Sequence, residues 1–261
     1  MYRKVLLISL VALGLGGGFA VRALEAPVAS PTGGGSTLGL HPSVFAAADA
    51  LGMIRGAGRA QHAKGLIVTS YEGTGTGNGA AFTYRYEFVY APHRAARQQR
   101  TFENGRTVIE AVREGRAWNE TAPGINPAAV TSGAERRMAE IYLTPHGALR
   151  AAIDAEARDV MVSSSSQSTL ITVPVDIGSV RIVLGEGNRP VRAEVRVRGS
   201  TLAAEFSGYK DFNNYGVFAP VKIIRQENGK AVGELSVTAF VENPYVIVPL
   251  PEQLMEAAKS Q

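Results

Sequence analysis

Cysteine is absent from the 261 residues of this chain. The chain therefore has no thiol that could form a disulfide, ligate zinc or carry a lipid at a processed N-terminus. An exported protein of this composition must depend on its hydrophobic core for stability. A chain of this length can bury a core of sufficient size.

Histidine is scarce as well. His41, His62, His93 and His146 stand apart, without the short spacing by which two imidazoles share a metal ion. No Gly-x-Ser-x-Gly segment is present to seat a nucleophilic serine. We therefore expect no catalytic residue, no metal and no cofactor, and predict that the chain is not an enzyme. An enzyme of an unrecognised type would need polar groups that converge around His146 or Asp211.

There is little excess of charge of either sign. The sequence has 27 lysines and arginines and 23 aspartates and glutamates. Arg3, Lys4 and Arg22 lie in a segment that we expect to be removed on export, which leaves 24 bases against 23 acids. A nucleic-acid-binding surface needs a larger basic excess, so no nucleic acid partner is expected.

A long apolar run occurs only near the N-terminus. Arg3 and Lys4 precede apolar residues over 5–21, and the run ends in a Val-Arg-Ala segment at Ala23. This pattern predicts a signal peptide over 1–23 and hence a periplasmic protein. A retained membrane anchor is the alternative, although glycines interrupt the run.

The rest of the chain changes character twice. Residues 24–41 are rich in proline, glycine, serine and threonine, which predicts a flexible linker. Apolar residues then recur at helical spacing after Pro42, and the period changes to two after Lys64. We predict one β-rich domain over 42–250 and a C-terminal tail over 251–261.

The expected fold class is mainly β (α+β). About ten antiparallel strands are predicted, and a sheet of that size twists into a curved sheet or half-barrel. Helical patterns at its start and over 134–143 and 145–157 supply an N-terminal helix and two mid-chain helices that could cover the open face.

Turn residues divide the β-rich region. Asn104-Gly105 predicts a tight hairpin, and the glycines over 73–79 predict a flexible hairpin loop. A turn cluster at 211–216 separates two alternating segments. Pro220 lies in the second of these segments and lacks an N–H group, which predicts an edge strand or a bulge there.

The strongest alternation in the chain places five aromatic residues on one face of a strand over 82–90. Such a face packs well into a core, and it could equally line an apolar cavity, because tyrosine offers an apolar ring with a polar tip. A tryptophan and three residues of the mid-chain helices could complete the lining. The candidate ligand-binding residues are Phe82, Tyr84, Tyr86, Phe88, Tyr90, Trp118, Tyr142, Leu149 and Ile153.

Several short segments resemble a known exported module: ADALG at 48–52, AWNE at 117–120, LTPHG at 143–147, and YKDF at 209–212 with Pro220. They resemble the β-rich N-terminal region of some metallo-β-lactamase-fold hydrolases, over residues 42–243. That region is similar to the LolA/LolB-like periplasmic lipoprotein-carrier superfamily. The resemblance implies a curved sheet closed by helices around a cavity for acyl chains. The His-x-His-x-Asp-His motif of the hydrolases is absent, so their activity is not implied.

Two functions follow as hypotheses. The first is an exported, non-enzymatic protein that binds a lipid or another hydrophobic small molecule in a half-barrel cavity. The second is a docking module for an envelope protein partner or a separately encoded hydrolase. Docking would use a sheet edge near Pro220 or the basic stretch Arg94, Arg97 and Arg100. That stretch could instead be a solvated strand face or a rim for anionic headgroups.

Overall fold

A computed structural model describes residues 39–54, 65–155, 159–165 and 168–259. The described residues belong to one compact unit, Ser36–Gln261. The expected signal peptide, most of the expected linker and His62 lie outside the described residues. No helix among the described residues is long and apolar enough to cross a bilayer.

The unit contains four α-helices and fifteen strands in the described ranges, together with a short 3-10 helix, η3 (Glu186–Asn188). The helices are α1 (Pro42–Ala50), α2 (Ala134–Tyr142), α3 (Pro145–Asp154) and α4 (Glu252–Lys259). The strands are β1 (Val68–Gly77), β2 (Ala80–Val89), β3 (Ala95–Phe102), β4 (Thr107–Arg113), β5 (Arg116–Glu120), β6 (Ala128–Val130), β7 (Met161–Ser164), β8 (Thr169–Val175), β9 (Gly178–Leu184), β10 (Pro190–Val197), β11 (Ser200–Ser207), β12 (Lys210–Asp211), β13 (Phe218–Ala219), β14 (Lys222–Glu227) and β15 (Lys230–Glu242).

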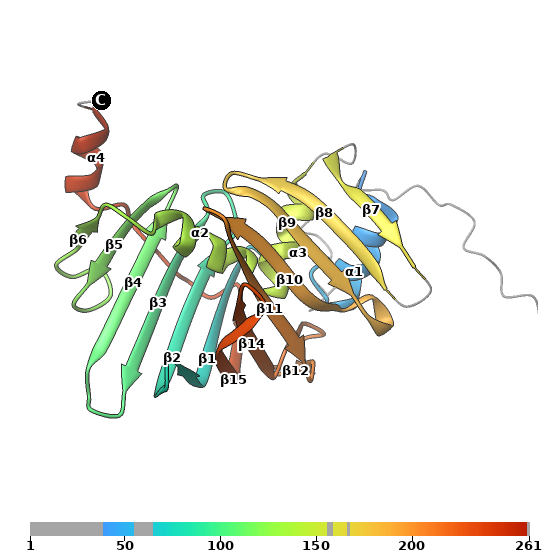
Figure 1. Ribbon diagram of the computed structural model, residues 1–261, viewed down its shortest axis with the longest axis horizontal. Coiled ribbons are helices and arrows are strands. Elements are labelled where there is room, and N and C mark those ends of the chain that lie inside the picture. Colours follow the sequence, from blue (N-terminus) through green and yellow to red (C-terminus); the bar gives the residue numbers. More distant parts are fainter. Residues whose placement is uncertain (1–38, 55–64, 156–158, 166–167, 260–261) are drawn as a thin grey trace, which may run out of the picture. The chain divides into compact units, whose positions relative to one another are not determined.

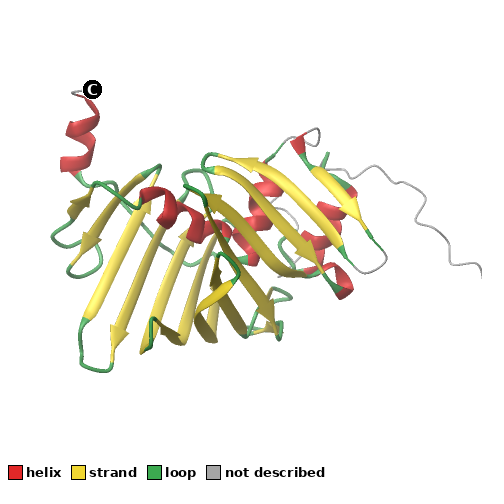
Figure 2. Cartoon of the chain, viewed as in Figure 1, coloured by secondary structure: helices red, strands yellow, loops and turns green. Residues whose placement is uncertain are grey.

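Thirteen of these strands form a single open antiparallel sheet in the order β6-β5-β4-β3-β2-β1-β15-β14-β11-β10-β9-β8-β7 (Figures 1 and 2). Helix α2 contacts β3 and β4 as well as β10, although these strands are far apart in the sheet order. One short helix can reach both only because the sheet curves around it. The predicted fold class, a curved antiparallel sheet with helices on one face, is confirmed.

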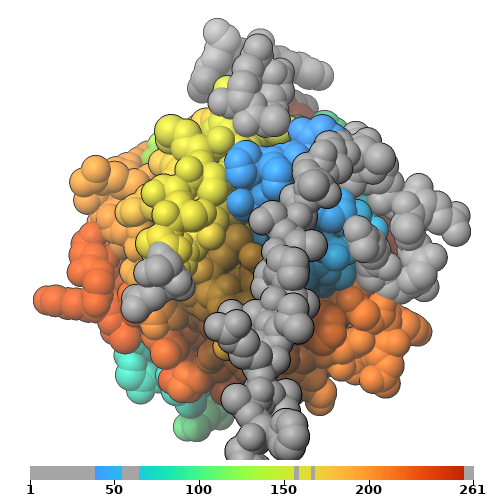
Figure 3. Space-filling model, turned by 90° about the vertical axis from the view of Figure 1, so that its right-hand side faces the viewer, coloured from blue at the N-terminus to red at the C-terminus, as the bar shows by residue number. Residues whose placement is uncertain are grey.

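We call the face that carries Phe82, Tyr86 and Phe88 the concave face, and the opposite face the convex face. Helices α2 and α3 lie against the concave face, and both join one large hydrophobic core with it. Helix α1 packs beside α3 and β8, and Figure 3 views the unit from this end, with α1 in blue beside yellow β7 and β8. Thr144 caps α3 by accepting a hydrogen bond from Gly147 N at 3.0 Å, and Pro145 occupies the first turn.

One predicted detail is wrong, and one of the two alternatives for another is not observed. The glycines after residue 72 do not form a loop, because β1 continues to Gly77 and only Asn78-Gly79 makes the turn. A Cβ at Gly75 would lie 2.8 Å from the Phe82 ring, so glycine lets that ring cover the strand. Pro220 is not on an edge strand. It falls in a break between β13 and β14, and β14 pairs with β11 and β15 inside the sheet.

Candidate ligand cleft on the concave face

Four aromatic residues of β2, together with Tyr90 directly after it, share the concave face, as their alternation predicts. All five are buried in the main core: Phe82, Tyr84, Tyr86, Phe88 and Tyr90. The row does not border one continuous open space, because the helices cover part of it. Its two ends therefore have different surroundings.

One end of the row is closed by α3 and the segment before it. Tyr90 Oη lies 2.6 Å from Thr69 Oγ1 and 3.2 Å from Thr144 Oγ1. Tyr71 Oη lies 2.5 Å from Nδ1 of His146, and its ring packs edge-on against Phe88. These hydrogen bonds satisfy the buried hydroxyl groups, as is typical of a packed core.

The helical candidates lie in or beside that closed region. Leu149 and Tyr142 are buried in the main core, and Ile153 packs against it partly buried. Tyr142 Oη donates to Asp176 Oδ1 at 2.6 Å. These three residues are positioned as the underside of the helical cover.

Trp118 does not join the other candidates. It lies on the convex face, where it forms a second hydrophobic cluster with Ala95, Ala111 and Val248 of the C-terminal segment. The reason is the register of β5: Trp118 pairs with Ala111, and Ala111 pairs with Arg97, whose side chain is also convex.

The other end of the row opens into a cleft of about 830 Å³ beneath α2. Phe82 and Tyr86 are the members of the row that line it. Further apolar lining comes from β3, β4 and β15, namely Phe102, Val108, Val232 and Leu235. The rings of Phe82 and Phe102 meet edge-to-face with centroids 5.7 Å apart. The cleft thus has an aromatic and aliphatic floor.

Charged side chains surround this floor. Five arginines and three glutamates line the cleft: Arg100, Arg106, Arg136, Arg137, Arg225, Glu110, Glu140 and Glu227. Most of them tie α2 to the sheet on both sides. Arg137 pairs with Glu110 of β4 at 3.1 Å, and Arg136 pairs with Glu227 of β14 at 2.9 Å. Glu140 of α2 pairs with Arg225 at 2.8 Å.

Some polar groups of the cleft have no partner among the described residues. Nε of Arg100, Nη1 of Arg225 and Nε2 of Gln98 are buried and form no hydrogen bond. Tyr86 pairs with Gln98 across β2 and β3. Burial raises the pKa of Tyr86 to about 12, against the positive charges of Arg100 and Arg225, which lower it.

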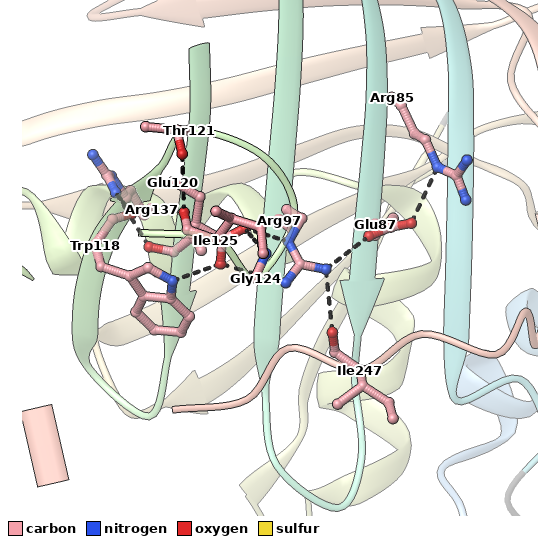
Figure 4. A network of polar contacts seen from close by, with 11 residues as sticks. Arg85, Glu87, Arg97, Trp118, Glu120, Thr121, Gly124, Ile125, Arg137 and Ile247 are labelled. Carbon is pink, nitrogen blue, oxygen red and sulfur yellow. Dashed lines mark hydrogen bonds and ion pairs between the residues drawn. The ribbon is translucent and has the colours of Figure 1, made fainter. Parts of the chain in front are cut away.

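The basic stretch of β3 does not form one surface. Arg97 and Arg100 lie three positions apart on a strand and therefore point to opposite faces. Arg100 lines the cleft, whereas Arg97 is buried on the convex face between Glu87 and Glu120 and donates to the carbonyl of Ile247 (Figure 4). Arg94 contacts the ring of Tyr142 instead. The expected docking face is thus divided among three environments.

No catalytic arrangement is evident at the two candidate positions. His146 is fully buried, and Asp211 accepts hydrogen bonds from the backbone N–H groups of Asn213, Tyr215 and Gly216 in its own loop. Among the residues with described placement, no three His, Asp or Glu side chains gather as metal ligands.

Sequence reasoning missed the arginines and glutamates that α2 and β14 bring to the cleft. The sequence did contain one signal. Helical spacing places Arg136 and Glu140 on the same side of α2, and strand alternation places Arg225 on the opposite face of its strand from the two adjacent residues. Which strands lie opposite α2 depends on the curvature of the sheet, and no local pattern contains that information.

No protein-family model matches the chain, and no curated protein matches its sequence. Among solved structures, the chain is similar to a LolA superfamily protein from Nitrosomonas europaea, with a TM-score of 0.44 and 14% identity over 81% of this chain and 95% of that one. It is also similar to a putative outer membrane lipoprotein-sorting protein domain from Vibrio parahaemolyticus, with a TM-score of 0.42 and 9% identity over 79% and 99%. A third is the lipoprotein LppX of Mycobacterium tuberculosis, with a TM-score of 0.26 and 14% identity over 77% and 98%. All three TM-scores are below 0.5, so the function proposed for this chain depends on the geometry of its own cleft.

Proposed function

We propose that this chain is a non-enzymatic binding protein that holds a ligand with an apolar chain or ring system in the cleft beneath α2. The observation that carries the proposal is the cleft itself, with its volume of about 830 Å³ and its floor of Phe82, Phe102 and Leu235. Pockets of 300–1,000 Å³ with apolar walls and a few polar groups are typical of small-molecule sites.

The position of the open space supports different proposed roles for the sequence candidates. Phe82 and Tyr86 are proposed to contact the ligand, because they line the cleft. Phe88, Tyr90 and Leu149 are proposed to support the site from the closed core. Trp118 lies on the other face and is left out of the proposed site.

The alternative, docking onto an envelope protein or a separately encoded hydrolase, has less support. Pro220 falls between β13 and β14, and β14 has a neighbouring strand on both sides in the large sheet. Arg97 is buried, so the basic docking face expected from the sequence is not formed by the described residues. A periplasmic location follows in this proposal from the expected signal peptide over 1–23.

The test is uptake of a neutral apolar probe, N-phenyl-1-naphthylamine, by residues 24–261. We expect saturable enhancement of probe fluorescence. Phe102→Glu replaces a ring of the floor by a hydrated charge and should weaken binding of the neutral probe at least about tenfold, because it removes apolar contact area from the cleft. Thr101→Glu is the matched control, since Thr101 is the neighbour on the other face of β3.

Two results would overturn the proposal. One is a wild-type protein that does not enhance the fluorescence of the probe. The other is a Phe102→Glu protein that is folded by circular dichroism and binds the probe as tightly as the wild type does. Mass spectrometry of the protein isolated from a periplasm adds a second readout, because a co-purified ligand gives a mass excess.

A further inference from the structure

We infer that the ligand of this cleft is an amphiphile with an anionic oxygen headgroup, a carboxylate or a phosphate, which Arg100, Arg225 and Gln98 bind at the edge of the apolar floor. This inference rests on the proposed function, since it assigns the chemistry of the ligand that the cleft holds. Neither the fold nor the comparisons assign a headgroup site.

The first argument is charge. The cleft has five arginines and three glutamates, which is an excess of positive charge in a partly enclosed space. Arg106 adds to this excess, because its guanidinium lies 4.7 Å from the Phe102 ring centroid and contacts no carboxylate among the described residues. A concave site with one sign of charge attracts ligands of the opposite sign.

The second argument is the set of buried donors without acceptors. Arg100 Nε, Arg225 Nη1 and Gln98 Nε2 are all buried, and each lacks a hydrogen bond. Leaving a buried donor unpaired costs free energy, and native proteins rarely do so. All three residues line the same cleft, so the oxygens of one anion are suitable acceptors for them.

Arg97 is a buried arginine with a structural role, and its hydrogen bonds provide a comparison for those of Arg100. Its Nε and Nη2 donate to Glu120 at 2.9 and 3.4 Å, and its Nη1 donates to Glu87 and to the Ile247 carbonyl. Every guanidinium nitrogen of Arg97 is therefore satisfied inside the chain. Arg100 lies on the same strand but faces the cleft, where its Nη2 pairs with Glu110 and its Nε lacks a partner.

The third argument is the position of these donors relative to the floor. Gln98 pairs with Tyr86, and Arg100 pairs with Tyr84, across the register of β2 and β3. Phe82 and Phe102 form the next pair on the same face of these two strands. Along this face of the sheet, the polar side chains of Gln98 and Arg100 therefore lie beside the apolar rings of Phe82 and Phe102. A ligand with an anionic group at one end of an apolar chain matches that order.

The experiment measures displacement of N-phenyl-1-naphthylamine by three ligands with the same chain: dodecanoate, dodecyl phosphate and dodecanol. We expect at least one anion to displace the probe at a concentration at least about tenfold lower than dodecanol does, as one charge-assisted hydrogen bond can supply. The more effective anion then distinguishes a carboxylate from a phosphate headgroup.

Two variants locate the headgroup. Arg225→Gln should reduce the preference for the anion over dodecanol about tenfold or more. Gln98→Met should reduce it severalfold, and it breaks no hydrogen bond of its Nε2, which makes none in the free protein. Arg198→Gln is the control, because Arg198 pairs with Glu135 of α2 at 2.7 Å but does not line the cleft.

The outcomes separate the inference from the proposed function. Probe binding with equal displacement by dodecanol and both anions overturns the headgroup inference and leaves the apolar site in place. An anion preference that survives in both folded variants overturns the assigned residues. Failure of the wild-type protein to bind the probe overturns the proposed function and the inference with it.

Discussion

The indole Nε1 of Trp118 donates a hydrogen bond of 2.7 Å to Oε1 of Glu120 (Figure 4). The other oxygen of this carboxylate, Oε2, accepts a hydrogen bond of 2.9 Å from Nε of Arg97. The backbone N–H of Gly124 donates to the same carboxylate at 2.8 Å. Glu120 therefore joins a buried cation, the single tryptophan of the chain and a loop. This carboxylate is the common acceptor of the polar network on the convex face.

Glu120→Gln should lower the free energy of unfolding by about 3 kcal/mol, because it leaves the buried charge of Arg97 without its main partner. Chemical denaturation measures the change. Glu114→Gln removes an exposed carboxylate paired with Arg113 and should change stability by less than about 0.5 kcal/mol. A Glu120→Gln protein as stable as the Glu114→Gln control would contradict the structural role of this network.

The C-terminal segment over 244–250 should protect Trp118 from solvent. Val248 is 4% exposed and packs against Trp118, whereas Ile247 points outward and is 55% exposed. Val248→Ser should lower the free energy of unfolding by about 2 kcal/mol and shift the Trp118 fluorescence to the red, since it removes buried apolar contacts. Ile247→Ser is the matched control and should leave both quantities near their wild-type values.

His146 makes stability depend on pH. Burial lowers its pKa to about 3, although a hydrogen bond to the Phe218 carbonyl, 3.0 Å from Nε2, raises it. The unfolded chain binds the proton with a pKa near 6.5, so the stability from the neutral imidazole is fully present above pH 6.5 and is lost as the pH falls toward 3. Between pH 7 and 5 the wild type should lose about 2 kcal/mol from this group.

Denaturation of His146→Gln over the same pH range tests this assignment. The variant should lose about 2 kcal/mol less stability than the wild type between pH 7 and 5. His93 provides the comparison variant His93→Gln: its side chain is exposed, with Nδ1 2.6 Å from Glu114 Oε1, and its replacement should alter the pH dependence much less than His146→Gln does. Equal slopes for wild type and His146→Gln would show that the buried imidazole is not the cause.

Glu140 competes with the ligand for Arg225. Its carboxylate lies 2.8 Å from Nη2 of Arg225 and occupies part of that guanidinium. Glu140→Gln should therefore raise the affinity for dodecanoate or dodecyl phosphate by about threefold or more and leave dodecanol unchanged. Glu135→Gln on the same helix, whose partner Arg198 does not line the cleft, should have no effect. Weaker binding of the anion by Glu140→Gln would contradict the headgroup site.

Periodicity predicted the arrangement of β2 because every second residue over 82–90 is aromatic and lies on the same face. The period of two also applies to Arg97 and Arg100, and it places their side chains on opposite faces of β3. The short strand around Trp118 offered no comparable pattern. The face on which Trp118 lies follows from the register of β5 with β4, and tertiary pairing sets that register.

The cleft was less predictable than the sheet. Its floor combines β2 and β3 with β15, and its charged rim combines β3 and β4 with α2 and β14. These elements become neighbours only after the sheet has curved and α2 has crossed it. Local propensity predicts that each element exists, but it contains no information about which side chains then converge.

The chain order within the sheet has a kinetic consequence. Strands β1 to β6 form one run of successive hairpins and β7 to β11 begin another, while the first and last long strands, β1 and β15, meet in the middle. Glu72 and Thr238 hydrogen bond across that junction although they are 166 positions apart. Hairpins close quickly because their loops are short, whereas this junction requires closure of a very long loop. Folding should therefore build two separate meanders first, and their joining along β1 and β15 should be the late, slow step that completes the curved wall around α2.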